Sequence, residues 1–181
     1  MHKQIVSISI FILIITAGAL LHLLKTSGSS VSQHTCPFCD ETVINRQKFY
    51  EDRFVIVMCT HQPIVPSHFP IIPKRHVERL ELLTHKELTH IHQAINKVHQ
   101  ASHSVFETFP YLIHQKNGRK IGQSVLHVHF HFIGKRSGDN SKTRFLAKML
   151  WAYLRGPISP TKMQKVVEKM GPAMELTPAS L

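Results

Sequence analysis

Three histidines at two-residue spacing are the residues of this chain whose types and positions are best suited to chemistry. His127, His129 and His131 alternate with apolar residues in the run 126–133. Alternate side chains of a β-strand point to one face, so a strand here would place all three imidazoles on one surface. A neutral imidazole can act as a nucleophile, transfer a proton near neutral pH or bind a metal. The run therefore predicts a catalytic or metal-binding site.

The triad lies in one of three sequence blocks that together resemble a known family. This block, N-G-(x)3-G-Q-S-V-x-H-V-H-F-H-F-I, covers residues 117–133. The second block runs from Pro63 to His76, and the third is Cys-Pro-Phe-Cys at residues 36–39. Their order and separation resemble the histidine triad (HIT) superfamily of nucleotidyl hydrolases and transferases. The resemblance implies an α+β, HIT-like fold, in which an antiparallel sheet carries one long central helix.

The resemblance also implies a mechanism. His129 would attack the α-phosphorus of a nucleotide and form a covalent nucleotidyl-histidine, which water or another acceptor then resolves. His131 would stabilise the charge that develops on the non-bridging phosphate oxygens. The other implied residues are Ser124 and Gln123 at the leaving group and bridging oxygen, Asn117 at the phosphate, and His68 in a supporting, orienting role.

A structural Zn²⁺ site is a further implication of the resemblance. Cys36, Cys39, His76 and His127 match the ligands of the zinc-binding branch, and a closed four-ligand site is structural. Same-face neighbours on a strand lie about 7 Å apart, so a metal on His127 would not touch phosphorus at His129. Two alternatives stay open. The cysteines could form a redox pair or a disulfide, and His76 could be a surface residue that begins a helix.

Thr60 departs from the family pattern. Many nucleotide-binding members have an acidic residue three positions before the proline that is Pro63 here, and its carboxylate accepts hydrogen bonds from both ribose hydroxyls. A threonine hydroxyl cannot supply that bidentate anionic acceptor. Specificity for a purine ribonucleoside is therefore left open, although the phosphate chemistry is still predicted.

Residue patterns predict the elements that position these groups. Residues 54–58 and 69–72 predict strands joined by a turn at 63–66, and Pro70 predicts an edge or a bulge in the second strand. Thr84-His85-Lys86-Glu87 has the form of a capping box, and apolar residues recur at helical spacing from there to Pro110. Further predictions are a short strand at 111–114, a loop at 117–122, the triad strand at 125–133, an amphipathic helix at 145–154 and a second helix from 159–160 to 171–172.

Composition divides the chain into three parts. These are a hydrophobic segment and linker over residues 1–30, a HIT domain over 31–140 and a C-terminal helical extension over 141–181. Residues 4–24 contain no Lys, Arg, Asp or Glu and could cross a bilayer as a helix. A single-pass membrane anchor is therefore the leading prediction. The alternative is a signal cleaved near Ala17-Gly18-Ala19, which would export the domain.

The charge balance favours an anionic partner. The chain has 22 Lys+Arg against 11 Asp+Glu, and the excess lies around the triad, where it would attract a phosphorylated ligand. The leading prediction is a membrane-tethered HIT enzyme acting on a nucleoside phosphoramidate or dinucleoside polyphosphate. The alternative is a tethered nucleotide- or anion-binding module with little or no turnover. A homodimer is an open option, nucleic acid is not an expected partner, and no thioredoxin-like pattern supports a redox protein.

Overall fold

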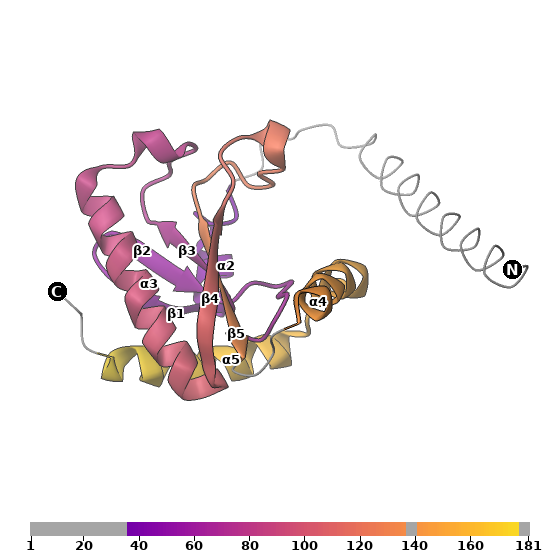
Figure 1. The fold of residues 1–181 in the computed structure, drawn as a ribbon. Coiled ribbons are helices and arrows are strands. Elements are labelled where there is room, and N and C mark those ends of the chain that lie inside the picture. Colours follow the sequence, from indigo (N-terminus) through magenta and orange to yellow (C-terminus); the bar gives the residue numbers. More distant parts are fainter. Residues whose placement is uncertain (1–35, 137–140, 178–181) are drawn as a thin grey trace, which may run out of the picture. The chain divides into compact units, whose positions relative to one another are not determined.

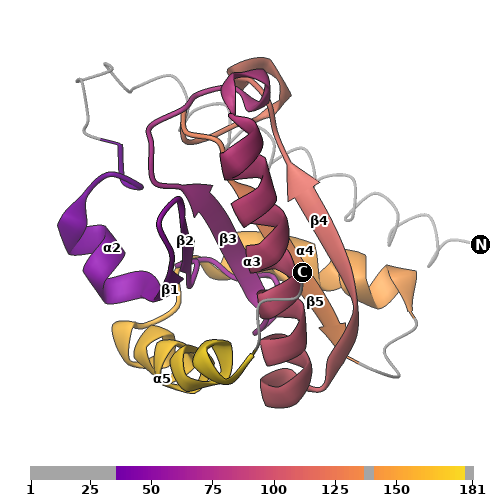
Figure 2. The same cartoon turned by 90° about the vertical axis from the view of Figure 1, so that its left-hand side faces the viewer.

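The computed structural model describes residues 36–136 and 141–177. They contain a five-stranded antiparallel sheet with the order β1-β2-β3-β5-β4, which confirms the predicted α+β, HIT-like fold. Figure 1 shows the long helix α3 on one side of the sheet and α4 on the other, and Figure 2 agrees. The strands are β1 (Lys48–Glu51), β2 (Val55–Met58), β3 (His68–Pro73), β4 (Thr108–Gln115) and β5 (Phe130–Arg136), and the two helices are α3 (His85–Phe106) and α4 (Lys142–Arg155).

Two apolar clusters lie on opposite faces of the sheet. The larger one contains Phe69 and Phe132 and is covered by α3 and by α5 (Pro160–Leu176). The smaller one contains Ile72 and is covered by α2 (Glu41–Gln47). Because strand side chains alternate between faces, β3 contributes to both clusters. The sheet is thereby held in the centre of the domain, and the triad lies at one end of it.

The capping box at the start of α3 is confirmed. The Thr84 hydroxyl accepts from the Glu87 backbone N–H (3.2 Å), and the Glu87 carboxylate accepts from the Thr84 backbone N–H (2.8 Å). Glu87 is buried and also pairs with Arg75 at 2.8 Å; this pairing lowers the pKa of the Glu87 carboxyl to about 2. The helix ends at Phe106, before Pro110, because Glu107 turns the chain in the left-handed region with φ 56°.

Several elements differ from the predictions in extent. The triad strand begins at Phe130, five residues later than predicted, so His127 and His129 precede the ladder. Helix α5 continues through Pro172 to Leu176, because Met170 and Met174 are fully buried in the larger core and outweigh one lost hydrogen bond. The short elements α2 and β1 were not predicted, and β4 and α4 are longer than expected.

Pro70 lies in a strand inside the sheet, yet its surroundings are locally those of an edge. Strand β3 has β5 on one side over His68 to Ile71 and β2 on the other over Ile71 to Pro73. Pro70 is paired with His131 and lies beyond the stretch that β2 covers. Its missing N–H therefore removes no bond from the β2 ladder.

The prediction of a single-pass membrane protein is corrected. Across residues 36–136 and 141–177, no helix is both long enough and apolar enough to cross a bilayer. The longest of them, α3, has 22 residues but carries charged and histidine side chains on its exposed face, so its apolar residues form one stripe only. Residues 4–24, on which the prediction rested, lie outside the described residues.

Candidate functional site

His129 is held in one tautomer by the backbone beside it. It is 6% exposed, and its Nδ1–H donates to the His127 carbonyl at 2.7 Å. A carbonyl oxygen can only accept, so the neutral ring has its lone pair on Nε2. Burial lowers the pKa of His129 below its ordinary value, which keeps that lone pair available at neutral pH. The Phe38 ring packs edge-on against the imidazole, with 5.1 Å between ring centroids.

His131 is oriented by a second histidine, through a bond between the neighbouring strands β3 and β5. The Ile64 backbone N–H donates to His68 Nδ1 (3.1 Å), so the neutral His68 ring carries its proton on Nε2. That Nε2–H donates to His131 Nδ1 at 2.9 Å. The remaining proton of neutral His131 is then on its Nε2. Burial lowers the pKa of His68 to about 4 and that of His131 to about 3, so both rings are neutral near pH 7.

The triad has two neighbours that no motif identified. His114 of β4 is paired in register with His131, and the two rings stack with centroids 6.1 Å apart. Lys116 contributes positive potential that helps to lower the pKa of both His129 and His131. A cation at this position would also attract a phosphate. Only the pairing of β4 with β5 brings these residues to the site, so local sequence carries no signal for His114.

The loop before the triad is fastened by two of the predicted substrate-binding amides. Asn117 accepts from the Leu80 backbone N–H (2.9 Å), and its Nδ2 donates to Glu81 (2.8 Å). Gln123 is 4% exposed, accepts from the Gly118 backbone N–H (2.6 Å) and donates to the Glu78 carbonyl. Ser124 is exposed three residues before His127. The loop therefore exposes the Ser124 hydroxyl and uses the amides of Asn117 and Gln123 to hold its own conformation.

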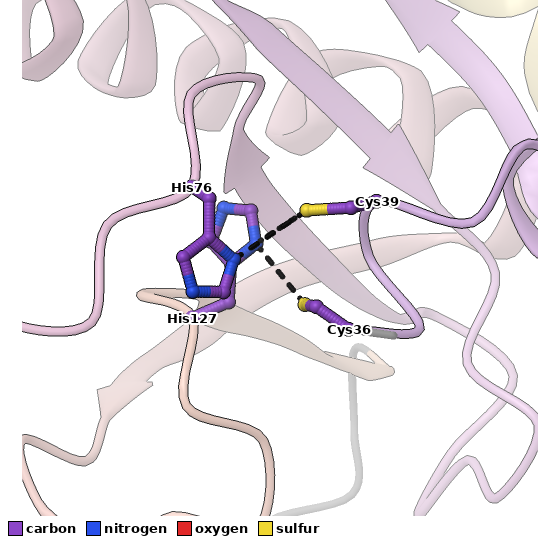
Figure 3. A group of neighbouring side chains, drawn as sticks. All are labelled: Cys36, Cys39, His76 and His127. Atoms are coloured by element: carbon purple, nitrogen blue, oxygen red, sulfur yellow. Dashed lines mark hydrogen bonds between the residues drawn. The ribbon is translucent and has the colours of Figure 1, made fainter. Parts of the chain in front are cut away.

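Four potential metal ligands, one of which is His127, lie close together (Figure 3). Cys36 and Cys39 lie in a tight turn, His76 follows β3, and His127 is fully buried. The distance from His127 Nδ1 is 3.4 Å to Cys36 Sγ and 3.6 Å to Cys39 Sγ, and His76 Nδ1 lies 3.5 Å from Cys39 Sγ. All four ligand atoms lie within 4.8 Å of one another.

The protonation of this cluster suits a cation. His127 Nε2–H donates to the Pro73 carbonyl at 2.8 Å, which leaves the Nδ1 lone pair facing the sulfurs. Both cysteines are free thiols. Burial, together with the charge of Cys39, raises the pKa of the Cys36 thiol to about 11, so a pair of thiolates here calls for a neighbouring positive charge. The cluster could therefore hold a metal ion, and His76 is one of its members.

The loop that carries Thr60 is held by the C-terminal extension. The Gln62 side chain donates to the Ala152 carbonyl (3.0 Å), and Arg155 donates to the Pro63 carbonyl (2.7 Å). The Thr60 hydroxyl itself accepts from the Gln62 backbone N–H at 3.4 Å. Helix α4 thus shapes the segment in which the family pattern places its acidic ribose ligand, a role that its amphipathic sequence did not indicate.

Comparisons with known proteins agree with this geometry. The chain is 35% identical over 99 residues to bis(5'-nucleosyl)-tetraphosphatase (asymmetrical) from Schizosaccharomyces pombe, a match that covers 55% of this chain and 54% of that protein. It is 28% identical over 97 residues to the bifunctional bis(5'-adenosyl)-triphosphatase/adenylylsulfatase FHIT from Arabidopsis thaliana, covering 54% of each chain. The chain thus spans about half the length of these two relatives.

A solved structure and a family model complete the comparison. A zinc-bound histidine triad family protein from Mycobacterium smegmatis has the same fold, with a TM-score of 0.59 at 18% identity over 78% of this chain and 94% of that one. The family model of the HIT domain matches residues 41–138, which include β1 to β5 and all three triad histidines. Because this match covers more than half of the 181 residues, the chain belongs to the HIT family.

Proposed function

We propose that the chain is a HIT hydrolase or nucleotidyl transferase that cleaves at the α-phosphate of a nucleotide derivative. The observation that carries this proposal is the bond from His129 Nδ1–H to the His127 carbonyl, which leaves Nε2 unprotonated. The relatives' names support hydrolysis of dinucleoside polyphosphates. The substrate class is therefore a dinucleoside polyphosphate or a nucleoside phosphoramidate.

The reaction proceeds in two displacements. His129 Nε2 attacks the α-phosphorus, an N–P bond forms, and the bond from phosphorus to the leaving oxygen or nitrogen breaks with its electron pair on the leaving group. A water molecule or another acceptor then attacks the same phosphorus and releases His129 with its lone pair restored. The bond to the His127 carbonyl stabilises the positive charge on the ring between the two steps.

The surrounding residues position the phosphate. His131 presents Nε2–H as a donor to a non-bridging oxygen because His68 occupies its Nδ1. Lys116 adds positive potential, and Ser124 supplies a hydroxyl to the leaving group. Asn117 and Gln123 remain predicted substrate ligands. Each would have to exchange a hydrogen bond that now holds the loop, so we expect their main contribution to be the position of Ser124.

We propose Zn²⁺ for the metal cluster. Bonds of about 2.3 Å to sulfur and about 2.0 Å to nitrogen place tetrahedral ligand atoms roughly 3.3–3.8 Å apart. Three of the six separations, 3.4, 3.5 and 3.6 Å, fall in this range, and all six lie within 4.8 Å. A closed Cys₂His₂ site supplies structural stability and no open coordination position. Cys36, Cys39, His76 and His127 would hold it. A zinc-bound protein of the same fold also supports this choice.

A homodimer stays a prediction. Strand β4 is at the edge of the sheet, and its Phe109 and Leu112 side chains are 64% and 48% exposed. An open edge with exposed apolar side chains is a surface that supports pairing with a second copy.

Trapping of the covalent intermediate tests the proposed activity. The protein is incubated with diadenosine tetraphosphate, diadenosine triphosphate or adenosine phosphoramidate, quenched in alkali because phosphohistidine bonds are labile in acid, and analysed by mass spectrometry. We expect a nucleotidyl adduct on His129. Substrate turnover without any adduct, together with turnover by His129→Ala, would remove the covalent mechanism.

A further inference from the structure

A cavity at the end of the sheet where β5 terminates is separate from the triad and the metal cluster. Its volume is about 380 Å³, within the range of roughly 300–1,000 Å³ typical of small-molecule sites. Its walls come from the segment before β3, the end of α3, the end of β5, and helices α4 and α5. None of the triad histidines, His68 or the four metal ligands lines it.

The charged residues that line this cavity are all cations. Lys135 and Arg136 come from β5, Lys148 from α4 and Lys169 from α5. Lys135 and Lys148 are half-buried. Arg136 also pairs with Glu107 at 3.2 Å, and Glu107 lies outside the lining. A concave surface with one sign of charge concentrates ions of the opposite sign, so the ligand that suits these walls carries an anionic group.

The same wall contains a buried hydroxyl that has no hydrogen-bond partner among the described residues. Thr108 is 3% exposed, and within the described part of the chain its Oγ1 has no hydrogen-bond partner. Gly134 lies next to it. A Cβ at that position would lie 3.1 Å from Thr108 Oγ1 and 2.8 Å from Ser67 Oγ. Glycine at position 134 therefore allows the Ser67 and Thr108 hydroxyls to pack closely against the β5 backbone, where any side chain would collide with them. A buried hydroxyl without a partner is unfavourable, so a rotation of Thr108 that brings the hydroxyl to a ligand oxygen in the cavity would be favourable.

Most of the remaining lining is apolar, and the one further polar side chain, Ser67, already donates to the Gly134 carbonyl. Val65, Val105, Phe106 and Phe145 contribute aliphatic and aromatic surface next to the cations. A bare inorganic anion would leave that surface exposed to water, whereas a hydrocarbon body would cover it. The combination of cations, one hydroxyl and apolar walls thus favours an amphipathic ligand.

We propose that this cavity binds a small organic anion with an apolar body, whose phosphate or carboxylate head is held by Lys135, Arg136 and the Thr108 hydroxyl. The site is independent of the activity proposed for the triad. It joins the HIT domain to the C-terminal extension, since Phe145 and Lys148 of α4 contribute to its wall.

Calorimetric titration of the full chain tests this site. The probes are hexyl phosphate, hexanoate, inorganic phosphate and hexanol, so that the head group and the apolar body are varied separately. We expect one of the two amphipathic anions to bind with a Kd at least tenfold lower than those of both inorganic phosphate and hexanol. Failure of both amphipathic anions to bind, or equal affinity for inorganic phosphate, would overturn the proposal.

Variants locate the bound probe. The double variant Lys135→Gln with Arg136→Gln should weaken binding at least tenfold, and Thr108→Val, which keeps the side-chain shape, should weaken it several-fold. The matched control is Arg53→Gln with Lys86→Gln, two exposed cations outside the cavity, which should bind as the wild type does. If only Lys116→Gln reduces binding, the probe occupies the triad and the proposed site is wrong. Circular dichroism confirms that each variant is folded.

Discussion

His127 and His129 are two residues apart, yet His127 belongs to the group of potential metal ligands and His129 to the triad. Their rings carry the proton on opposite nitrogens. In the metal cluster His127 donates from Nε2 to the Pro73 carbonyl and directs Nδ1 at the cysteine sulfurs. In the triad His129 donates from Nδ1 to the His127 carbonyl and leaves Nε2 free. Burial lowers the pKa of both rings, so burial does not distinguish them. The backbone acceptor next to each ring decides which nitrogen can react.

The two regions are also physically connected. The carbonyl that fixes His129 belongs to His127, and Phe38, from the cysteine turn, contacts both rings with centroid separations of 5.9 and 5.1 Å. A metal ion bound to His127 would therefore hold in place the His127 carbonyl, which is the acceptor that orients His129. We infer that the cluster supplies rigidity and that the triad supplies reactivity, so changes in the two regions should affect different measurements.

The largest expected effect is the loss of turnover when His129 of the triad is replaced. His129→Ala should reduce turnover by at least about 10³-fold, because it removes the nucleophile. Its zinc content and melting temperature should stay close to those of the wild type, since His129 is not a metal ligand. Steady-state kinetics, elemental analysis and a thermal melt measure the three quantities. Loss of zinc from this variant would contradict the division between the regions.

Replacing a residue of the metal-ligand group, Cys36, Cys39, His76 and His127, is expected to lower zinc content and stability. Cys39→Ser should lose zinc and lower the free energy of unfolding by roughly 2–4 kcal/mol, because metal binding is coupled to folding. The buried Cys59→Ser is a matched control outside the cluster, which should keep its zinc. Denaturant unfolding with metal analysis provides the measurement. A Cys39→Ser protein as stable as the wild type would show that no structural metal is held there.

A smaller effect is expected from the histidine pair that orients the triad. His68→Leu should lower kcat by up to about 100-fold, the lower end of the loss for a transition-state donor, because His131 is then free to adopt the wrong tautomer. His68→Gln can accept from Ile64 and donate to His131, so it should recover most of kcat. KM should change little in either variant. Equal losses in both variants would point to packing and not to the tautomer.

The smallest effect concerns the pH dependence of stability. The folded pKa values of His68 and His131, about 4 and about 3, lie below the unfolded value of about 6.5. The unfolded chain then binds more protons below pH 6.5, so stability is full above that pH and falls as pH decreases towards 4. The slope approaches about 1.4 kcal/mol per pH unit for each proton. His68→Gln should show a shallower slope in urea unfolding between pH 6.5 and 4, whereas an unchanged slope would exclude a contribution from His68.

The sequence predicted those parts of the site that depend on local pattern. The capping box from Thr84 to Glu87 is such a short-range feature, and the structure has it. The convergence of four metal ligands also agrees with the family pattern. Local pattern did not predict where the triad strand begins, because pairing with β3 and β4 extends only to Phe130.

Long-range geometry accounts for what the sequence could not predict. The bond from His68 to His131 joins residues 63 positions apart, and His114 reaches the triad only through the register of β4 with β5. The loop bonds of Asn117 and Gln123 depend on the segment that follows β3. The contact of α4 with the Thr60 loop spans about half the chain. None of these interactions has a signature in neighbouring residues.

His127 and His129 are opposite tautomers, and long-range proton–nitrogen correlation NMR measures this directly. The protein is labelled with ¹⁵N-histidine and loaded with zinc, and the variants His127→Gln and His129→Gln assign the two rings. We predict a proton on Nε2 of His127 and on Nδ1 of His129, with Nε2 of His129 unprotonated at pH 7. A proton on Nε2 of His129 at that pH would contradict the account, because the nucleophilic nitrogen would then have no lone pair.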